Sequence, residues 1–260
     1  MKPLLITVLV LTAVGAGGCA RNAGDVQPAA GLPADRTFLS TSVTEDGKDR
    51  PLVRGTRIRL TIDNERLSVD AGCNSLSGNA RLDGDRLVVD NMGGTEMGCE
   101  PELADQDSWL SGFLTGGPSW RLEGDTLRLT MGGTTIELLD RPVADPDRPL
   151  RETNWQLDTL VDGETASSLP GEAKAHITFG ENGRATGNAG CNDFSAQFEE
   201  AGEEITFSAV TTTRKSCGGT RDEVEQAVLA VLEASPTYEI VAGRLRLAAP
   251  SGNELGFHEG

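Results

Sequence analysis

Apolar and polar residues alternate in many short segments along this chain, and the same series of segments occurs twice. Strict alternation is typical of a strand with one buried face. It predicts strands near residues 37–39, 57–62, 80–82, 87–89, 120–122, 127–129 and 136–138. The second series lies near residues 155–157, 175–179, 195–198, 204–207, 238–240, 245–247 and 255–257.

Two longer segments place their apolar residues at helical spacing instead. Residues 100–114 are acidic at the start and then apolar, and residues 220–233 begin at Thr220, a residue type that often caps helices. Each half is therefore predicted to contain one helix packed against a mostly antiparallel sheet that curls into a partial barrel. The expected fold class is α+β, with two small domains in tandem.

Sequence landmarks recur at one constant offset. The sequence AGCN at 71–74 returns at 189–192, 118 residues later, and LRL at 127–129 returns at 245–247 with the same offset. Several landmarks with one offset indicate a tandem duplication. We predict domains at 35–141 and 151–260. The linker at 142–150 is rich in proline and charge, which favours a semi-extended conformation.

The N-terminus has the pattern of an export signal. Lys2 precedes an apolar run at 4–14, and small residues at 16–18 stand directly before Cys19. Such a run is typical of a secretory signal and too short to span a bilayer. Small residues before a cysteine resemble the bacterial lipobox, which implies cleavage and lipidation at Cys19. We predict a lipoprotein signal peptide at 1–18 and a flexible tether at 19–34. The alternative is an ordinary cleaved signal that leaves Cys19 as a free thiol.

Charge limits the classes of partner. The chain has 23 basic and 40 acidic residues, a formal net charge of -17. This balance argues against nucleic acid, whose phosphates require clustered Lys and Arg. It also repels anionic lipid, so we expect the membrane contact to be the acyl chains on Cys19. The expected location is the bacterial cell envelope, on the extracytoplasmic side of a membrane. We expect a monomer, with an envelope protein as its partner.

Four further cysteines form an even set, which in an exported protein indicates disulfides. Four cysteines allow three pairings. Duplication favours Cys73–Cys99 and Cys191–Cys217, because each domain then closes its own bridge. Redox chemistry is the alternative, since Cys99 and Cys217 stand just before predicted helices, a position that favours the thiolate. However, no two of these cysteines are spaced as Cys-x-x-Cys, and we predict neither a metal nor a cofactor.

Short motifs around these cysteines resemble the META domain (HslJ-like) family. They are GCN at 72–74 with TEMGC at 95–99, and GCN at 190–192 with TRKSC at 213–217. The resemblance covers most of the chain after the tether. It implies a small β-rich domain, often in secreted or lipid-anchored bacterial proteins, some of them linked to stress tolerance. It brings no catalytic residue and no established ligand. Glu96 and Lys215 depart from the usual pattern, so a binding surface there would differ between the copies.

The candidate binding set comprises Asn74, Thr95, Asn192, Thr213 and Arg214. Each asparagine either contacts a ligand or satisfies backbone groups in a tight turn, and we favour the turn.

The residues needed for catalysis are scarce in this sequence. The only histidines are His176, on a predicted strand, and His258, in a predicted tail, and there is no Gly-x-Ser-x-Gly motif. We expect a non-enzymatic, lipid-anchored envelope protein that serves binding, stress response or envelope maintenance. The alternatives are a thiol–disulfide redox enzyme of the envelope and a stress protein that binds a small molecule.

Overall fold

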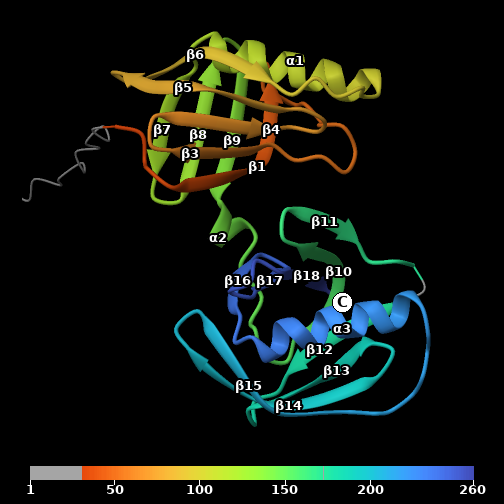
Figure 1. Ribbon diagram of the computed structural model, residues 1–260. Coiled ribbons are helices and arrows are strands. Elements are labelled where there is room, and N and C mark those ends of the chain that lie inside the picture. The colour runs from red at the N-terminus through yellow and green to blue at the C-terminus, as the bar shows by residue number, and fades with distance from the viewer. Residues whose placement is uncertain (1–30, 172) are drawn as a thin grey trace, which may run out of the picture.

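The computed structural model describes residues 31–171 and 173–260 (Figure 1). They form two domains of one architecture, each a nine-stranded antiparallel sheet with one long helix. This confirms the predicted α+β class and the tandem arrangement. The predicted signal peptide, Cys19 and most of the tether lie outside the described residues. None of the described helices is both long and apolar enough to cross a membrane.

Domain 1 carries its helix between the sixth and seventh strands. Its sheet has the order β2-β1-β3-β4-β5-β6-β7-β8-β9, and β1 also pairs with β9, so the sheet curls until β9 meets β1. Its elements are β1 (Arg36–Glu45), β2 (Lys48–Asp49), β3 (Arg59–Asp63), β4 (Arg66–Asp70), β5 (Ser75–Asp83), β6 (Arg86–Gly94), α1 (Pro101–Thr115), β7 (Ser119–Glu123), β8 (Thr126–Met131) and β9 (Thr134–Asp140).

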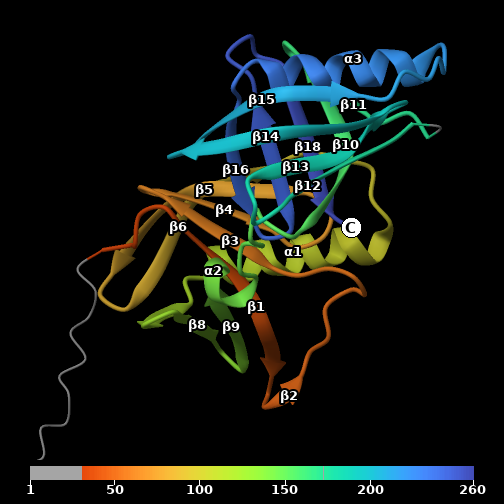
Figure 2. The same cartoon turned by 90° about the horizontal axis from the view of Figure 1, so that it is seen from below.

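Domain 2 repeats this order. Its sheet runs β11-β10-β12-β13-β14-β15-β16-β17-β18, with β10 also paired to β18. Figure 2 shows the helix of this domain alongside β15. The elements are β10 (Asn154–Asp162), β11 (Thr165–Ser168), β12 (Lys174–Phe179), β13 (Arg184–Gly190), β14 (Asp193–Ala201), β15 (Glu204–Thr212), α3 (Thr220–Glu233), β16 (Thr237–Val241), β17 (Arg244–Ala248) and β18 (Glu254–Glu259).

Each long helix lies in the connection between two strands that share only one pair of residues. In domain 1, β6 and β7 pair only at Arg86 and Ser119, and α1 packs against β6 beyond that point. Leu110 and Leu114 of α1 are almost wholly buried in the core. Burial of such a side chain stabilises a fold by about 1.5–3 kcal/mol. The helix is therefore held firmly enough to position polar groups next to the sheet.

Several local predictions were wrong. Thr220 is the first residue of α3 rather than its cap, which is Gly219 without a side-chain hydrogen bond. His258 is no tail residue, since it lies in β18 opposite Gln156 and Arg244. Strands β4 and β13 were not predicted. In β13 the apolar positions hold only Ala and Gly, residue types with low strand propensity.

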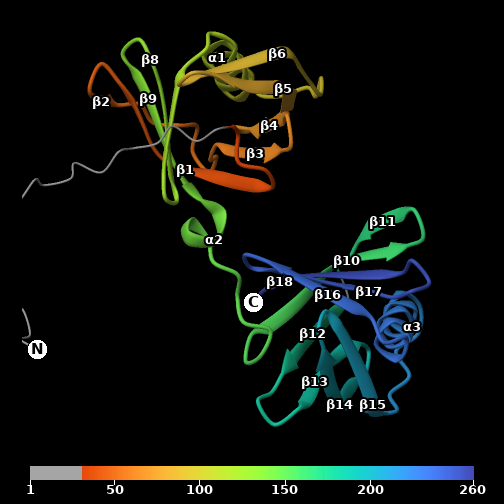
Figure 3. The ribbon, with the colours of Figure 1, turned by 90° about the vertical axis from the view of Figure 1, so that its left-hand side faces the viewer.

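The linker is more ordered than its composition suggests. Residues Arg141–Ala144 form a short helix, α2, with a proline in its first turn, where proline is tolerated (Figure 3). Arg141 pairs with Asp147, whose carboxylate also accepts the N–H of Ala242 in domain 2 at 2.7 Å. Arg148 pairs with Glu259 at 2.6 Å. These contacts, which composition does not reveal, replace the expected semi-extended linker.

Candidate functional site

The Gly-Cys-Asn turn of domain 2 lies between β13 and β14, against the first turns of α3. Gly190 has a φ of 119°, and a Cβ there would come within 2.9 Å of Val224 on the helix. Only glycine allows both the conformation and this close approach. The motif therefore begins with glycine because the turn passes directly against the helix.

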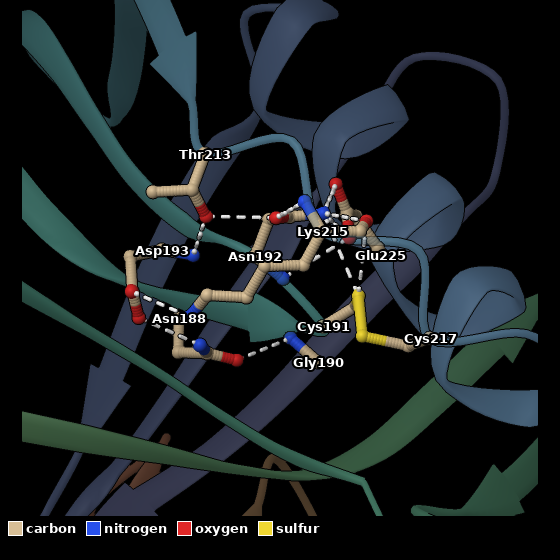
Figure 4. Close-up of polar contacts among 9 residues, drawn as sticks. All are labelled: Asn188, Gly190, Cys191, Asn192, Asp193, Thr213, Lys215, Cys217 and Glu225. Atoms are coloured by element: carbon tan, nitrogen blue, oxygen red, sulfur yellow. Dashed lines mark hydrogen bonds and ion pairs between the residues drawn. A yellow bond between two sulfur atoms is a disulfide. The ribbon is translucent and has the colours of Figure 1, made fainter.

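Asn192 is the centre of a polar network that joins this turn to the helix and to the loop before it (Figure 4). Its side-chain amide donates to both oxygens of Glu225, at 3.1 and 2.9 Å, and its main-chain N–H donates to the same carboxylate at 3.1 Å. Its side-chain oxygen accepts from the Thr213 hydroxyl at 2.7 Å and from the Lys215 N–H at 2.8 Å. Asn192 is only 5% exposed, so these bonds replace lost hydration.

Domain 1 contains the same network around Asn74. Its main-chain N–H and its amide donate to Asp107 at 2.8 and 3.2 Å. Its side-chain oxygen accepts from the Thr95 hydroxyl at 3.0 Å and from the Met97 N–H at 2.9 Å. We call these two sets the asparagine networks. They comprise Asn74, Thr95, Met97 and Asp107 in domain 1, and Asn192, Thr213, Lys215 and Glu225 in domain 2.

The two networks differ at the helix. Asp107 is one methylene shorter than Glu225, and only its Oδ2 reaches Asn74. Its Oδ1 is buried and has no hydrogen-bond partner among the described residues. Domain 1 adds Gln106, which donates to Thr56 and Ala71 and accepts from the Val53 N–H. The equivalent residue in domain 2 is Val224, which contributes packing instead.

A disulfide fastens each network to its loop. Cys73 is bonded to Cys99 and Cys191 to Cys217, with Cα–Cα distances of 6.2 and 5.9 Å, as the duplication predicts. In each domain Asp107 or Asp222 lies near the sulfurs, but a sulfur in a disulfide has no thiolate to offer a metal. The bridges therefore have a structural role in this state.

The loops held by these networks display different side chains. In the loop at 95–99, Glu96 is exposed and Met97 is 57% exposed. In the loop at 213–217, Arg214 and Lys215 are exposed, and Lys215 pairs with Asp193 at 3.3 Å. A hydrogen bond from Asn188 and the Lys215 ammonium hold the pKa of Asp193 below its usual value. One loop is thus acidic and apolar, and the other is basic.

Most of the predicted site residues come together. Asn74 and Thr95 meet in domain 1, and Asn192 and Thr213 meet in domain 2, where each asparagine satisfies backbone groups as favoured. Arg214 makes no hydrogen bond or ion pair with the described residues.

The helix partners of both asparagines were missed by the sequence analysis, although a signal for them exists. Asp107 and Glu225 are 118 residues apart, the offset of the repeat, and both are acidic. A search of the two helices for acidic residues at that offset finds them, together with Asp105 and Glu223.

These features define a class of small domain: a curled antiparallel sheet with one helix, closed by a disulfide and an asparagine network. The model of the META domain family matches residues 32–142 and 148–259. The chain therefore belongs to the META domain family, in two tandem copies.

Two solved structures are similar to this chain. A protein from Burkholderia xenovorans solved by NMR is 23% identical, with a TM-score of 0.38, over 43% of this chain and 83% of its own. A second NMR structure is 22% identical, with a TM-score of 0.33, over 40% of this chain and 88% of its own. No curated protein matches the sequence.

Proposed function

We propose that this protein is a non-enzymatic, lipid-anchored module of the bacterial cell envelope that binds a protein partner through the loops at 95–99 and 213–217. One observation carries the proposal. The two asparagine networks are nearly the same, yet the loops that they hold expose opposite charge. A constant scaffold with variable exposed loops is the arrangement expected of a binding protein.

A structural role for the motif residues supports the non-enzymatic part of the proposal. The four motif cysteines are in disulfides, and the side chains of Asn74 and Asn192 each use both oxygen and nitrogen inside their domain. Within the described residues, neither histidine ring contacts a hydroxyl or a thiol. His258 contacts Asp158 at 3.2 Å, and the hydroxyl beside this pair, that of Thr159, donates to Asp158 at 2.7 Å and makes no hydrogen bond with the ring. A Ser-His-acid or Cys-His arrangement requires a nucleophile that is hydrogen-bonded to the ring.

The sequence before the domains supports lipid anchoring. Small residues precede Cys19, and a cysteine at the start of an exported chain is otherwise unexplained. Replacement of Cys19 by alanine should abolish incorporation of labelled palmitate and release the protein from the membrane fraction. Retention in the membrane without acylation would contradict the anchor.

Photo-crosslinking from the loops tests the binding role. A photoreactive residue in place of Met97 or Arg214 should give a discrete adduct in intact cells. A matched control at Asp83, an exposed residue at the far end of β5, should give none. With the probe at position 97, exchange of Glu96 for the arginine of the other loop should abolish the adduct at domain 1. Equal labelling from Asp83, or turnover of an envelope substrate that depends on one side chain, would overturn the proposal.

Thiol–disulfide exchange is a second candidate. Cys99 lies two residues before the start of α1, and both Cys73 and Cys99 are half-buried, whereas Cys191 is buried. A partly exposed sulfur near a helix N-terminus is the position that redox cysteines occupy. Non-reducing peptide mapping of protein from its native membrane decides the matter. Two intact bridges support the binding module, and a free or mixed-disulfide Cys99 supports the enzyme.

A further inference from the structure

Strand β11 is an open edge of the domain 2 sheet. It is the first strand in the sheet order, and its one neighbour is β10. All four of its residues, Thr165–Ser168, are exposed. Figures 1 and 3 show the β10–β11 hairpin standing out from the rest of the sheet. Its outer edge therefore carries main-chain N–H and C=O groups that face solvent.

The hairpin geometry shows which residue presents these groups. Asp162 pairs with Thr165 across a two-residue turn in which Gly163 has a φ of 59°, as a type II′ turn requires. The pair that closes such a turn exchanges hydrogen bonds, and the next pair, Val161 and Ala166, does not. The N–H and C=O of Ala166 thus point away from β10.

The corresponding edge of domain 1 is protected. Strand β2 has only two residues, Lys48 and Asp49, and Arg50 and Pro51 follow. Short length, charge and proline are the features that keep an edge from pairing with another chain. Strand β11 has no charged residue and is twice as long, although Pro170 follows it as closely as Pro51 follows β2. The difference singles out domain 2 as the domain that can accept an added strand.

A cavity lies beside this edge. It has a volume of about 230 Å³ and lies between α3 and strands β10, β11 and β18. Its walls include Leu160, Ala227, Val231 and Leu255, with Ser167 of β11 at its border. Because side chains of a strand alternate between faces, a strand added to β11 directs every second side chain toward this cavity.

The charges beside the edge indicate the occupant. Asp162 borders the cavity, Glu164 is at the tip of the hairpin, and both are exposed without an ion pair to the residues that the structure describes. A second copy of the chain would bring the same acidic tip, and a formal net charge of -17, against this one. A basic peptide complements both acids.

We propose that β11 is a docking edge for an extended, basic peptide segment of a protein partner. The segment adds to the sheet as a further strand and places an apolar side chain in the cavity beside α3. Main-chain hydrogen bonds provide affinity in this mode, and the cavity provides selectivity. The site is separate from the loops at 95–99 and 213–217, so it stands or fails independently of the function proposed for them.

A defined peptide tests the proposal with the full-length protein in detergent. The probe is a fluorescent hexapeptide that alternates leucine and threonine between terminal lysines, and its binding is followed by anisotropy. We expect saturable binding. Ala166→Pro should weaken it about tenfold or more, the effect of losing a main-chain hydrogen bond in the complex. Ala227→Phe should weaken it similarly by filling the cavity, whereas Ala230→Phe, at an exposed position of the same helix, should not.

A second probe leaves the protein unchanged. The same hexapeptide with methyl groups on alternate main-chain nitrogens keeps its charge and side chains but loses its donors, and it should not bind. Three results overturn the proposal: no saturable binding of the unmodified peptide, equal binding of the methylated peptide, or concentration-dependent dimers that Ala166→Pro abolishes. The last result would assign the edge to a second copy of the chain.

Discussion

The asparagine network of domain 1 contains a buried oxygen without a partner, whereas that of domain 2 does not. Asp107 is 5% exposed and binds Asn74 through one oxygen, while Glu225 binds Asn192 through both. Domain 1 compensates with Gln106, which ties the helix to three further groups. Both copies therefore keep the hydrogen bonds between the asparagine and the helix, whereas the residues packed around these bonds differ between the copies.

Loss of a disulfide should have the largest effect on this comparison. Each bridge spans 26 residues, and closing a loop of that size stabilises a domain by about 3.5 kcal/mol in the chain-entropy model. Replacement of Cys73 and Cys99 by serine should raise hydrogen exchange throughout domain 1, measured by mass spectrometry. Domain 2 of the same molecule is the internal control. Unchanged exchange in domain 1 would show that its bridge does not support the fold.

Truncation of the asparagines comes next. Asn192→Ala leaves the Glu225 carboxylate, the Thr213 hydroxyl and the Lys215 N–H without their partner, and we expect a loss of about 2–3 kcal/mol. Asn74→Ala should cost less, about 1–2 kcal/mol, because Gln106 still ties α1 to domain 1. Urea unfolding of the two variants gives the order. Equal or reversed losses would contradict the compensating role of Gln106.

Shortening the acid of domain 2 to that of domain 1 sharpens the comparison further. Glu225→Asp should withdraw the carboxylate from Asn192 and cost about 1 kcal/mol in unfolding free energy. Glu223→Asp, at an exposed position of the same helix turn, is the matched control and should change little. A stability equal to that of the control would show that one carboxylate oxygen is sufficient.

The smallest expected effect is on the pH dependence of stability, and it depends on Asp158, an acid that domain 1 lacks. Burial raises the pKa of Asp158, but the hydrogen bond from Thr159 and the Arg244 guanidinium outweigh it and hold the pKa below its usual value. Domain 1 has Ser40 at the equivalent position. A carboxyl group whose pKa is lower in the folded than in the unfolded state stabilises the fold at pH values above its ordinary pKa. This stability is lost as the pH falls through the pKa of the folded state.

Asp158→Asn should therefore destabilise domain 2 by about 0.5–1 kcal/mol at pH 6, the range of partly exposed ion pairs. The difference from the unsubstituted protein should shrink below about pH 4. Thermal unfolding at a series of pH values measures it. A difference that is constant down to pH 2 would mean that the carboxylate charge has no part in it.

The repeat made the fold predictable to a large extent. Most strands follow from alternation, the two long helices follow from spacing, and the disulfide pairing follows from the duplication. What failed depends on contacts between distant parts of the chain. The linker is ordered because the Asp147 carboxylate accepts a hydrogen bond from the N–H of Ala242. His258 lies in a strand because β10 and β17 pair with its strand on either side. No local pattern encodes those neighbours.

Only part of the candidate site could be predicted from the sequence. The asparagines, threonines and cysteines stand out as motifs, but Asp107 and Glu225 lie on helices rich in other acids. Nothing in helical spacing distinguishes the acid that faces the turn from those that face solvent. The shared offset leaves two acidic pairs on the helices, Asp105 with Glu223 and Asp107 with Glu225, and the folded structure identifies the second pair.

In each motif the asparagine binds the acid of the helix and so fixes the turn against it. A double-mutant cycle between Asn192 and Glu225 tests this role most directly, with Asn192→Ala, Glu225→Ala and the double variant compared by urea unfolding. We predict a coupling free energy of about 1–3 kcal/mol, because either single change already removes the shared bonds. If the losses of unfolding free energy in the two single variants add up to the loss in the double variant, Asn192 and Glu225 are not coupled, and Asn192 is better explained as a ligand contact.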